Sequence, residues 1–205
     1  QYAESDWGRA HKAAAIALKV KVYAYWAFHD SSKWELIPEL VNSLESEFGR
    51  GLLDNYEDVF KVANNWSKEY IWSVTSKGSS EAGSEFPGVV LENKGWGKYN
   101  GWGYMKPTLG LFEEFKEGDT RRAVTILEYG QKFTFLGQEM EFYSTSDYEA
   151  GFMLNKYMEP FSYGKDGDLT TNPYISQNGD DPTTDLNLPL IRHAEMVLFK
   201  AEALI

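Results

Sequence analysis

The sequence contains no cysteine and only three histidines. The absence of thiols excludes disulfides, thiolate catalysis and cysteine-based zinc sites, so cysteine usage carries no information about the redox compartment. The histidines, His11, His29 and His193, fall at no metal-ligand spacing. Ordinary packing or exposure is therefore the default interpretation of each.

Clustered positive charge is also absent. The chain has 20 Lys and Arg residues against 31 Asp and Glu residues, and its formal net charge is −11. Nucleic acids and anionic membrane surfaces are bound by clustered positive charge. The charge pattern therefore argues against both kinds of partner.

Long apolar runs are missing too, and none approaches the roughly 20 residues that a membrane-spanning helix needs. No signal-peptide pattern is visible, and the first residue is Gln1. The last residues, "FKAEALI" at 199–205, continue a helical pattern without Gly, Asn or Pro to end it. We therefore expect the sequence to be part of a longer protein, with any targeting signal or lipid-anchor cysteine outside it.

Aromatic residues are abundant, at 16% of the chain, and they concentrate in "NKGWGKYNGWGYMKPT" at 93–108. This segment carries four glycines and four rings, Trp96, Tyr99, Trp102 and Tyr104. Glycine beside each Trp opens backbone conformations that other residues avoid, which predicts a shaped loop instead of a strand. Each ring either packs onto the core or faces outward, and both interpretations stay open for each.

Two helices are predicted near the start, over 8–28 and 34–49, joined by the polar turn "HDSSK". The first has alanines at helical spacing, so a second helix can approach closely, and we expect Ala14 and Ala17 to be buried. In the second, Pro38 suits the first turn and Gly49 is a plausible C-cap.

The rest of the chain has mixed patterns. We expect a short helix at 54–60, a strand at 68–76, a loop at 77–88, a helix over 107–122 capped by Thr108 with a turn at Gly118, a hairpin over 123–143 around Gly137, a strand at 151–158, a polar loop at 162–185 and a helix at 188–205. The predicted fold class is mainly α, with tetratricopeptide-like helical hairpins, inserted aromatic loops and a few short strands or hairpins. The 34-residue consensus of that repeat is not present in full.

Several polar and aromatic side chains have structural interpretations. Arg192 and Glu195, three apart on the last helix, predict an ion pair, and Glu202 is interpreted as structural too. Packing is expected for Trp72 and for the rings that border the first hairpin, Trp26 and Trp34. The remaining structural group is Asp119, Arg121 and Arg122, which we expect to cap and tie a turn.

Two loop segments concentrate oxygen ligands that would suit Ca²⁺, "KDGDLTTN" at 165–172 and "NGDDPTTD" at 178–185. Neither has the ligand spacing, glycine and terminal Glu of an EF-hand. Solvated loop charge is the better-supported interpretation, and no cofactor is predicted.

Four segments together resemble the SusD/RagB family. They are "GRAHKAAAIALKVKVYAYWA" at 8–27, "LLDNYEDVFKVANNWSKEYIWSV" at 52–74, "KPTLGLFEEFKEGDTRR" at 106–122 and "LPLIRHAEMVLFKAEAL" at 188–204. The matches follow the order of the family's motifs and span the whole chain. Residues 1–205 would then be part of one SusD/RagB-like domain, without its N-terminal lipidated segment and C-terminal helices.

The resemblance implies a non-catalytic lipoprotein on the outer face of the bacterial outer membrane. Family members capture nutrients, mostly oligosaccharides, and cover a TonB-dependent SusC-like transporter. The alternatives are a peptide-binding RagB-like uptake component and a helical protein-interaction scaffold. A glycoside hydrolase would need two carboxylates at a fixed separation, and the sequence singles out no such pair.

The resemblance also suggests a use for the aromatic segment. A Trp or Tyr ring can cover the apolar C–H face of a sugar with a large contact area and little lost side-chain freedom. We therefore predict that Trp96, Tyr99, Trp102 and Tyr104 bind ligand. The family motifs do not match these rings position by position, so this site is a hypothesis drawn from their chemistry.

Overall fold

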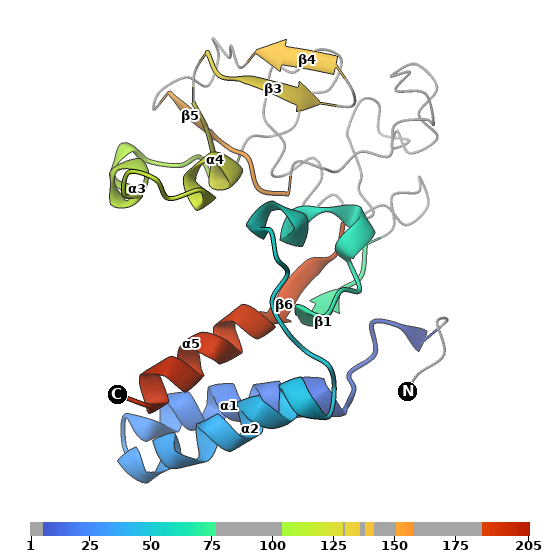
Figure 1. Cartoon of the computed structure of the whole chain (residues 1–205), viewed down its shortest axis with the longest axis vertical. Coiled ribbons are helices and arrows are strands. Elements are labelled where there is room, and N and C mark those ends of the chain that lie inside the picture. The colour runs from blue at the N-terminus through green and yellow to red at the C-terminus, as the bar shows by residue number, and fades with distance from the viewer. Residues whose placement is uncertain (1–5, 77–103, 129, 136–137, 142–150, 158–185) are drawn as a thin grey trace. The chain divides into compact units, whose positions relative to one another are not determined.

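The computed structural model describes residues 6–76, 104–128, 130–135, 138–141, 151–157 and 186–205 (Figure 1). The chain forms two compact units: unit 1 comprises Gln1–Asp54, Asn65–Val74 and Leu188–Ile205, and unit 2 comprises Asn55–Asn64 and Thr75–Asn187. The described part is mainly helical and its strands form three two-stranded sheets. This confirms the predicted balance of helices and short strands. None of the described helices is long and apolar enough to cross a membrane.

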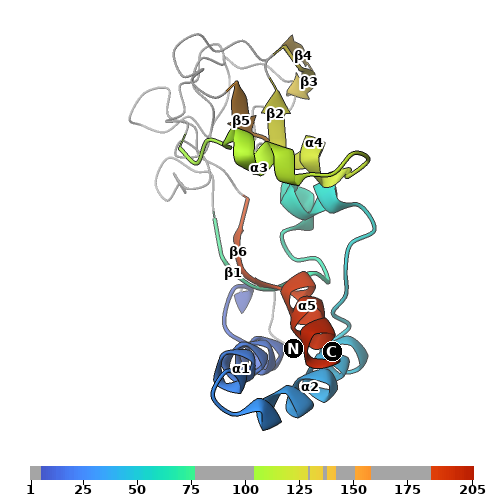
Figure 2. The same cartoon turned by 90° about the vertical axis from the view of Figure 1, so that its left-hand side faces the viewer.

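Unit 1 is built on helices α1 (Lys12–Ala27), α2 (Ile37–Ser46) and α5 (His193–Ala203), which lie together (Figure 2). The predicted helical hairpin is confirmed, but both helices are shorter than the predicted 8–28 and 34–49. The residues before it form the 3-10 helix η2 (Ser31–Leu36), which Asp30 caps by accepting a hydrogen bond from the Ser32 N–H at 3.2 Å. Pro38 lies in the first turn of α2, as predicted.

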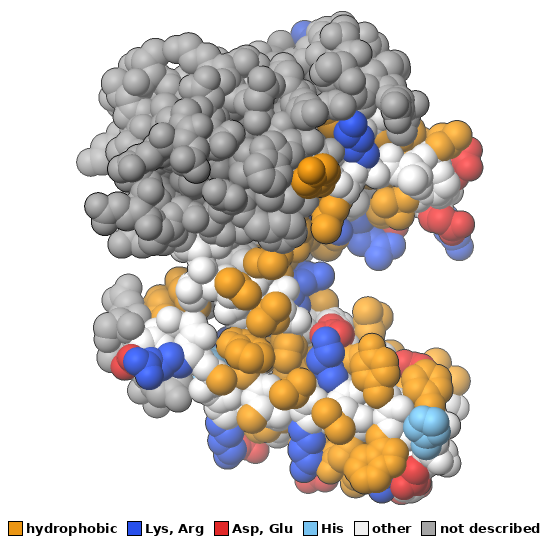
Figure 3. Space-filling view, turned by 180° about the vertical axis from the view of Figure 1, so that it is seen from behind, with side chains coloured by type: hydrophobic (Ala, Val, Ile, Leu, Met, Phe, Trp, Pro, Cys, Tyr) orange, Lys and Arg blue, Asp and Glu red, His pale blue; other side chains and the backbone are white. Residues whose placement is uncertain are grey.

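The buried face of α1 is made of small residues. Ala14 is 3% exposed and Ala17 is fully buried, which confirms both predictions. The core partners of this face are Ile37, Val41 and Leu44 of α2 and Met196 of α5. Larger apolar residues of α1, Leu18, Val22 and Tyr25, remain exposed, and hydrophobic side chains gather on one face of unit 1 (Figure 3). Small size therefore decided which face of α1 packs, because only small residues let helices approach closely.

Both ends of the first hairpin are closed by local hydrogen bonds. The His11 side chain accepts a hydrogen bond from the Ala14 N–H at the start of α1. After α2, Gly49 takes φ 61°, its N–H donates to the Glu45 carbonyl, and the Arg50 N–H donates to the Leu44 carbonyl at 3.0 Å. Gly49 thus provides the left-handed residue that ends the helix, as predicted.

The predicted helix at 188–205 was wrong over its first residues. Residues Leu188–Arg192 form strand β6, which pairs antiparallel with β1 (Tyr70–Val74), and α5 begins only at His193. Pro189, which has no N–H to donate, suits an edge strand better than a helix interior. The partner strand lies more than a hundred residues away in sequence, so no local pattern indicated the pairing.

The change from helix to strand also corrects the predicted ion pair. Arg192 lies on β6, and its Nη1 is 2.7 Å from Oε1 of Glu69, not paired with Glu195. Glu195 pairs with Lys21 of α1 at 2.8 Å. The three-residue spacing brings side chains together only when both residues are helical. Glu202 is exposed, and its predicted structural role stays a prediction.

The tryptophans of unit 1 divide between core and surface. Trp34 and Trp72 are partly buried against the core, which confirms their predicted packing. Trp26 was predicted to pack but is 49% exposed, and the Lys33 ammonium lies 4.8 Å from its ring centroid. This ring is on the outer side of α1, where a lysine covers it.

Unit 2 contains the short helices α3 (Leu109–Glu114) and α4 (Arg121–Thr125) and the 3-10 helices η3 (Tyr56–Phe60) and η4 (Val62–Asn64). Thr108 caps α3 by accepting a hydrogen bond from the Leu111 N–H at 3.2 Å. Gly118 turns the chain at φ 83°, and Asp119 accepts from the Arg121 N–H. The cap and the turn are as predicted.

The strands of unit 2 form two pairs. Strand β3 (Lys132–Phe135) pairs with β4 (Gln138–Glu141), with Phe135 opposite Gln138, which confirms the hairpin expected around Gly137. Residues earlier in the predicted 123–143 hairpin instead form α4 and β2 (Ile126–Glu128), and β2 pairs with β5 (Phe152–Leu154). Ile126, Leu127 and Met153 are buried in this second sheet.

Candidate functional site

The predicted aromatic segment enters the described structure only at its C-terminal end. Trp96, Tyr99 and Trp102 lie outside the described residues. Tyr104 is described, and its side chain is 58% exposed. The next residue, Met105, is also exposed and has φ 59°, an uncommon backbone conformation for a residue other than glycine.

The chain directly after Tyr104 is anchored. Pro107 is buried, and Thr108 caps α3 one residue later. A buried proline has a fixed φ, and a capped helix start satisfies a backbone donor that would otherwise lack a partner. The exposed Tyr104 ring therefore stands a few residues from a firmly held point of unit 2.

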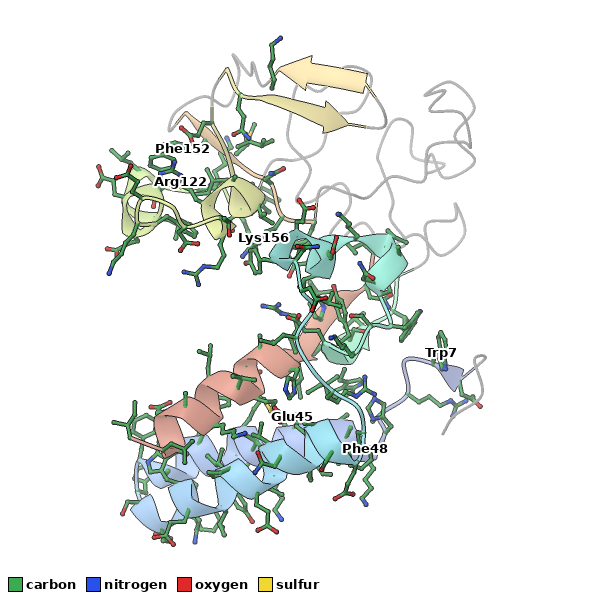
Figure 4. The ribbon with its side chains drawn as sticks, viewed as in Figure 1. Trp7, Glu45, Phe48, Arg122, Phe152 and Lys156 are labelled. Carbon is green, nitrogen blue, oxygen red and sulfur yellow. The ribbon has the colours of Figure 1, made fainter. Side chains whose placement is uncertain are left out.

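Helix α3 is held in turn by an aromatic stack. The ring centroids of Phe112 on α3 and Phe152 on β5 are 4.6 Å apart, with the planes inclined by 18°. The guanidinium of Arg122 lies 4.8 Å from the Phe112 centroid, and Figure 4 shows Arg122 close to Phe152. Stacked rings with a cation against one face are favourable both by area and by electrostatics. The stack joins α3, α4 and β5 within unit 2.

The turn between α3 and α4 is tied by Asp119. Hydrogen bonds from Arg121 lower the pKa of the Asp119 carboxyl from its ordinary value of 3.8 to about 2. A carboxyl whose folded-state pKa is depressed contributes stability above its unfolded-state pKa and loses it as the pH falls through the folded-state value. The tie is therefore intact near neutral pH and is lost only in strong acid. Asp119 and Arg121 thus behave as predicted.

A second aromatic cluster in unit 2 is structural. Phe60 makes edge contacts with Tyr56, at 5.2 Å between centroids, and with Tyr157, at 5.1 Å. The Lys156 ammonium lies 5.1 Å from the Tyr56 centroid (Figure 4). Tyr157 has φ 62°. Because Phe60 is buried at the centre of this cluster, its role is to hold η3 within the unit.

Unit 1 contains a cavity that the sequence patterns did not indicate. It has a volume of about 500 Å³, and three tryptophans, Trp7, Trp66 and Trp72, line it with Phe48 and Arg50. Trp7 and Trp66 are each 44% exposed, and their ring centroids are 5.4 Å apart at an angle of 51°. Figure 4 places Trp7 on the segment before α1 and Phe48 at the end of α2. The two exposed rings are far apart in sequence, so only folding brings them together.

Arg50 and His11 are among the polar residues that line this cavity. Nη1 of Arg50 donates a hydrogen bond to the Tyr70 carbonyl at 2.9 Å, and burial lowers the pKa of its guanidinium. The pKa of His11 is lowered by burial and then by the nearby Arg50 charge. His11 is therefore neutral near neutral pH, whereas Arg50 is a cation.

Metal-type ligands do not gather in the part of the chain that the structure describes. Within it, no group of three or more His, Asp or Glu side chains could hold a metal ion. The two calcium candidates, 165–172 and 178–185, lie outside the described residues.

The sequence profile of the SusD family matches residues 68–205. Among curated relatives, SusD-like protein P25 of Formosa agariphila is 26% identical over 170 residues, which cover 76% of this chain and 29% of the relative. A SusD-like protein of Bacteroides ovatus is 24% identical over 212 residues, covering 98% of this chain and 36% of the relative. The chain thus spans about a third of the length of these relatives.

Solved structures agree with this assignment at the level of the fold. Surface glycan-binding protein A from Bacteroides thetaiotaomicron gives a TM-score of 0.72 at 20% identity, covering 100% of this chain and 45% of that protein. A laminarin-binding SusD-like protein gives a TM-score of 0.69 at 22% identity, covering 99% and 45%. With the profile match extending over more than half of its residues, the chain belongs to the SusD family.

Proposed function

We propose that this chain is part of a cell-surface protein that binds oligosaccharides and does not cleave them. Membership of the SusD family supports the proposal. Proteins of similar fold have been solved with sugars bound: surface glycan-binding protein A with laminarihexaose, and another structure with a xylogluco-oligosaccharide. Glucose-based oligosaccharides of these two kinds are therefore the first ligands to test.

The proposed setting is the outer face of the bacterial outer membrane. A lipid anchor outside these residues would hold the protein there, and a SusC-like TonB-dependent transporter would receive the captured sugar. The scaffold would be tetratricopeptide-like, which is supported by the close packing of α1 and α2 through the alanine face. The family resemblance is the basis for the anchor and for the transporter.

The proposed ligand surface is the aromatic segment with Trp96, Tyr99, Trp102 and Tyr104. The observation that carries this placement is the 58% exposure of Tyr104 beside the buried Pro107 and the capped start of α3. An exposed ring on an anchored backbone can stack on a sugar without first paying for ordering of that backbone. The glycines of the segment would set the angles of the other rings.

The test is calorimetric titration of laminari- and xylogluco-oligosaccharides into the unmodified chain and into Trp96→Ala, Trp102→Ala and Tyr104→Ala. Loss of one stacking ring is expected to weaken binding by about ten- to a hundredfold. Tyr104→Phe keeps the ring and should retain most of the affinity. Trp26→Ala removes a half-exposed ring of α1 outside the segment and should leave the affinity unchanged.

Melting temperatures separate binding from packing. If the segment variants melt early while their folded fraction binds the sugar normally, the rings belong to the core and the proposed surface is wrong. Binding of oligopeptides by the unmodified chain, with no binding of any sugar, would favour the peptide-binding alternative instead.

A further inference from the structure

The cavity of unit 1 differs in charge from the rest of the molecule. The whole chain carries a net charge of −11, yet Arg9, Lys12 and Arg50 line this cavity, and among the described residues Glu47 is the only carboxylate in its lining. Arg9 is already paired with Asp6 at 2.9 Å, and the Lys12 ammonium lies 5.4 Å from the Phe48 centroid. An acidic chain therefore presents a local cationic surface at this cavity.

Arg50 is the cation of this surface whose charge is least compensated. Among the described residues, no carboxylate lies within ion-pair distance of it, and its Nε is buried without a hydrogen-bond acceptor. A partly buried cation without a counter-ion is destabilised, as the direction of its pKa shift indicates. A bound anion would remove that cost, and a guanidinium matches the planar geometry of a carboxylate.

The aromatic wall adds a second recognition element. Trp7 and Trp66 each leave about half of their surface exposed, and their tilt of 51° presents two differently oriented faces. Indole faces stack on the apolar side of sugar rings. The volume of about 500 Å³ falls within the range of roughly 300–1,000 Å³ that is usual for small-molecule sites, so a short oligosaccharide fits.

We propose that the unit 1 cavity is a second binding site, for an acidic oligosaccharide whose uronate carboxylate pairs with Arg50 while a sugar ring stacks on Trp7 or Trp66. This site goes beyond the proposed function, since the aromatic segment at 93–108 requires no charge on its ligand. It would give the protein separate sites for neutral and acidic sugars.

The experiment titrates trigalacturonic acid into the whole chain by calorimetry, with its fully methyl-esterified form as the neutral counterpart. Binding of the acid, weakened by salt and absent for the ester, is expected. Arg50→Gln should weaken it by about ten- to a hundredfold, and Arg50→Lys should weaken it less because the charge remains. Arg121→Gln is the matched control, since it removes an exposed arginine of unit 2 and should bind like the unmodified chain.

Arg50→Gln also removes the hydrogen bond to the Tyr70 carbonyl, and the variant could be unstable for that reason. Two further variants keep the proposal testable in that case. Trp66→Ala keeps Arg50 and should also weaken binding of the acid, while Trp96→Ala should not affect it. The proposal is overturned if the acid fails to bind, if acid and ester bind equally, or if Trp96→Ala abolishes acid binding and Trp66→Ala does not. It is also overturned if only an acidic peptide, oligo-glutamate, binds through Arg50. None of these results bears on binding of neutral sugars by the aromatic segment.

Discussion

Glu69 connects the three sequence segments of unit 1 through hydrogen bonds. Its side chain is almost completely buried, and Oε2 accepts a hydrogen bond from the Leu53 N–H at 2.9 Å while Oε1 accepts from Arg192. Its backbone carbonyl accepts from the His193 N–H. Sequence patterns could not predict this arrangement, because a pairing across 123 residues leaves no local spacing to recognise. The carboxylate fixes both the chain after α2 and the start of α5.

We predict that Glu69→Ala lowers the free energy of unfolding by about 3 kcal/mol, because breaking a buried pair leaves one charge uncompensated. The Arg192 side chain is 27% exposed, so water partly solvates its charge. The expected loss is therefore at the lower end of the usual range. Glu69→Gln fills the same space and keeps an acceptor for one of the two donors, so it should cost less. Urea unfolding of the two variants measures the difference, and equal losses would show that the acceptor and the volume that Gln retains contribute nothing.

At the level of elements, the predictions succeeded where the signal was local. Thr108, Gly49 and Pro38 mark helix ends through their own chemistry, and all three act as predicted. The start of α5 was missed because "LPLIR" at 188–192 is a short apolar run that fits a helix or a strand equally well. Its state depends on β1, which offers an edge to pair with.

The alanine face of α1 gives a matched test of helix packing. Ala17→Leu should overpack the contact with α2 and cost roughly 1–3 kcal/mol of stability, because Ala17 is fully buried. Ala15→Leu places the same side chain on the exposed side of the same helix and should be close to neutral. Thermal melting compares the two. Identical melting temperatures would mean that the close-packed face is wrongly assigned.

At the level of the whole molecule, the four motifs predicted the family, which the profile match confirms, while residue types indicated only one candidate surface. The glycine- and ring-rich segment at 93–108 was evident from residue types alone, and its end at Tyr104 is exposed as a binding ring requires. The cavity of unit 1 was not evident, because Trp7 and Trp66 become neighbours only through the fold.

We also predict that the chain has no hydrolase activity. The SusD family assignment motivates this expectation, and the sequence singles out no pair of carboxylates for acid and base catalysis. Prolonged incubation with laminari-, xylogluco- and galacturonic oligosaccharides should leave them intact by chromatography. The prediction is wrong if hydrolytic activity co-purifies with the protein and is lost when a single Asp or Glu is replaced.

The pairing of β1 with β6 makes residues 75–187 an insertion between two neighbouring strands. The Ser76 N–H donates to Oδ1 of Asn187 at 2.9 Å, so the insertion leaves and returns at almost the same point. Evolution can therefore lengthen, shorten or replace this stretch while the strand pair is inherited unchanged.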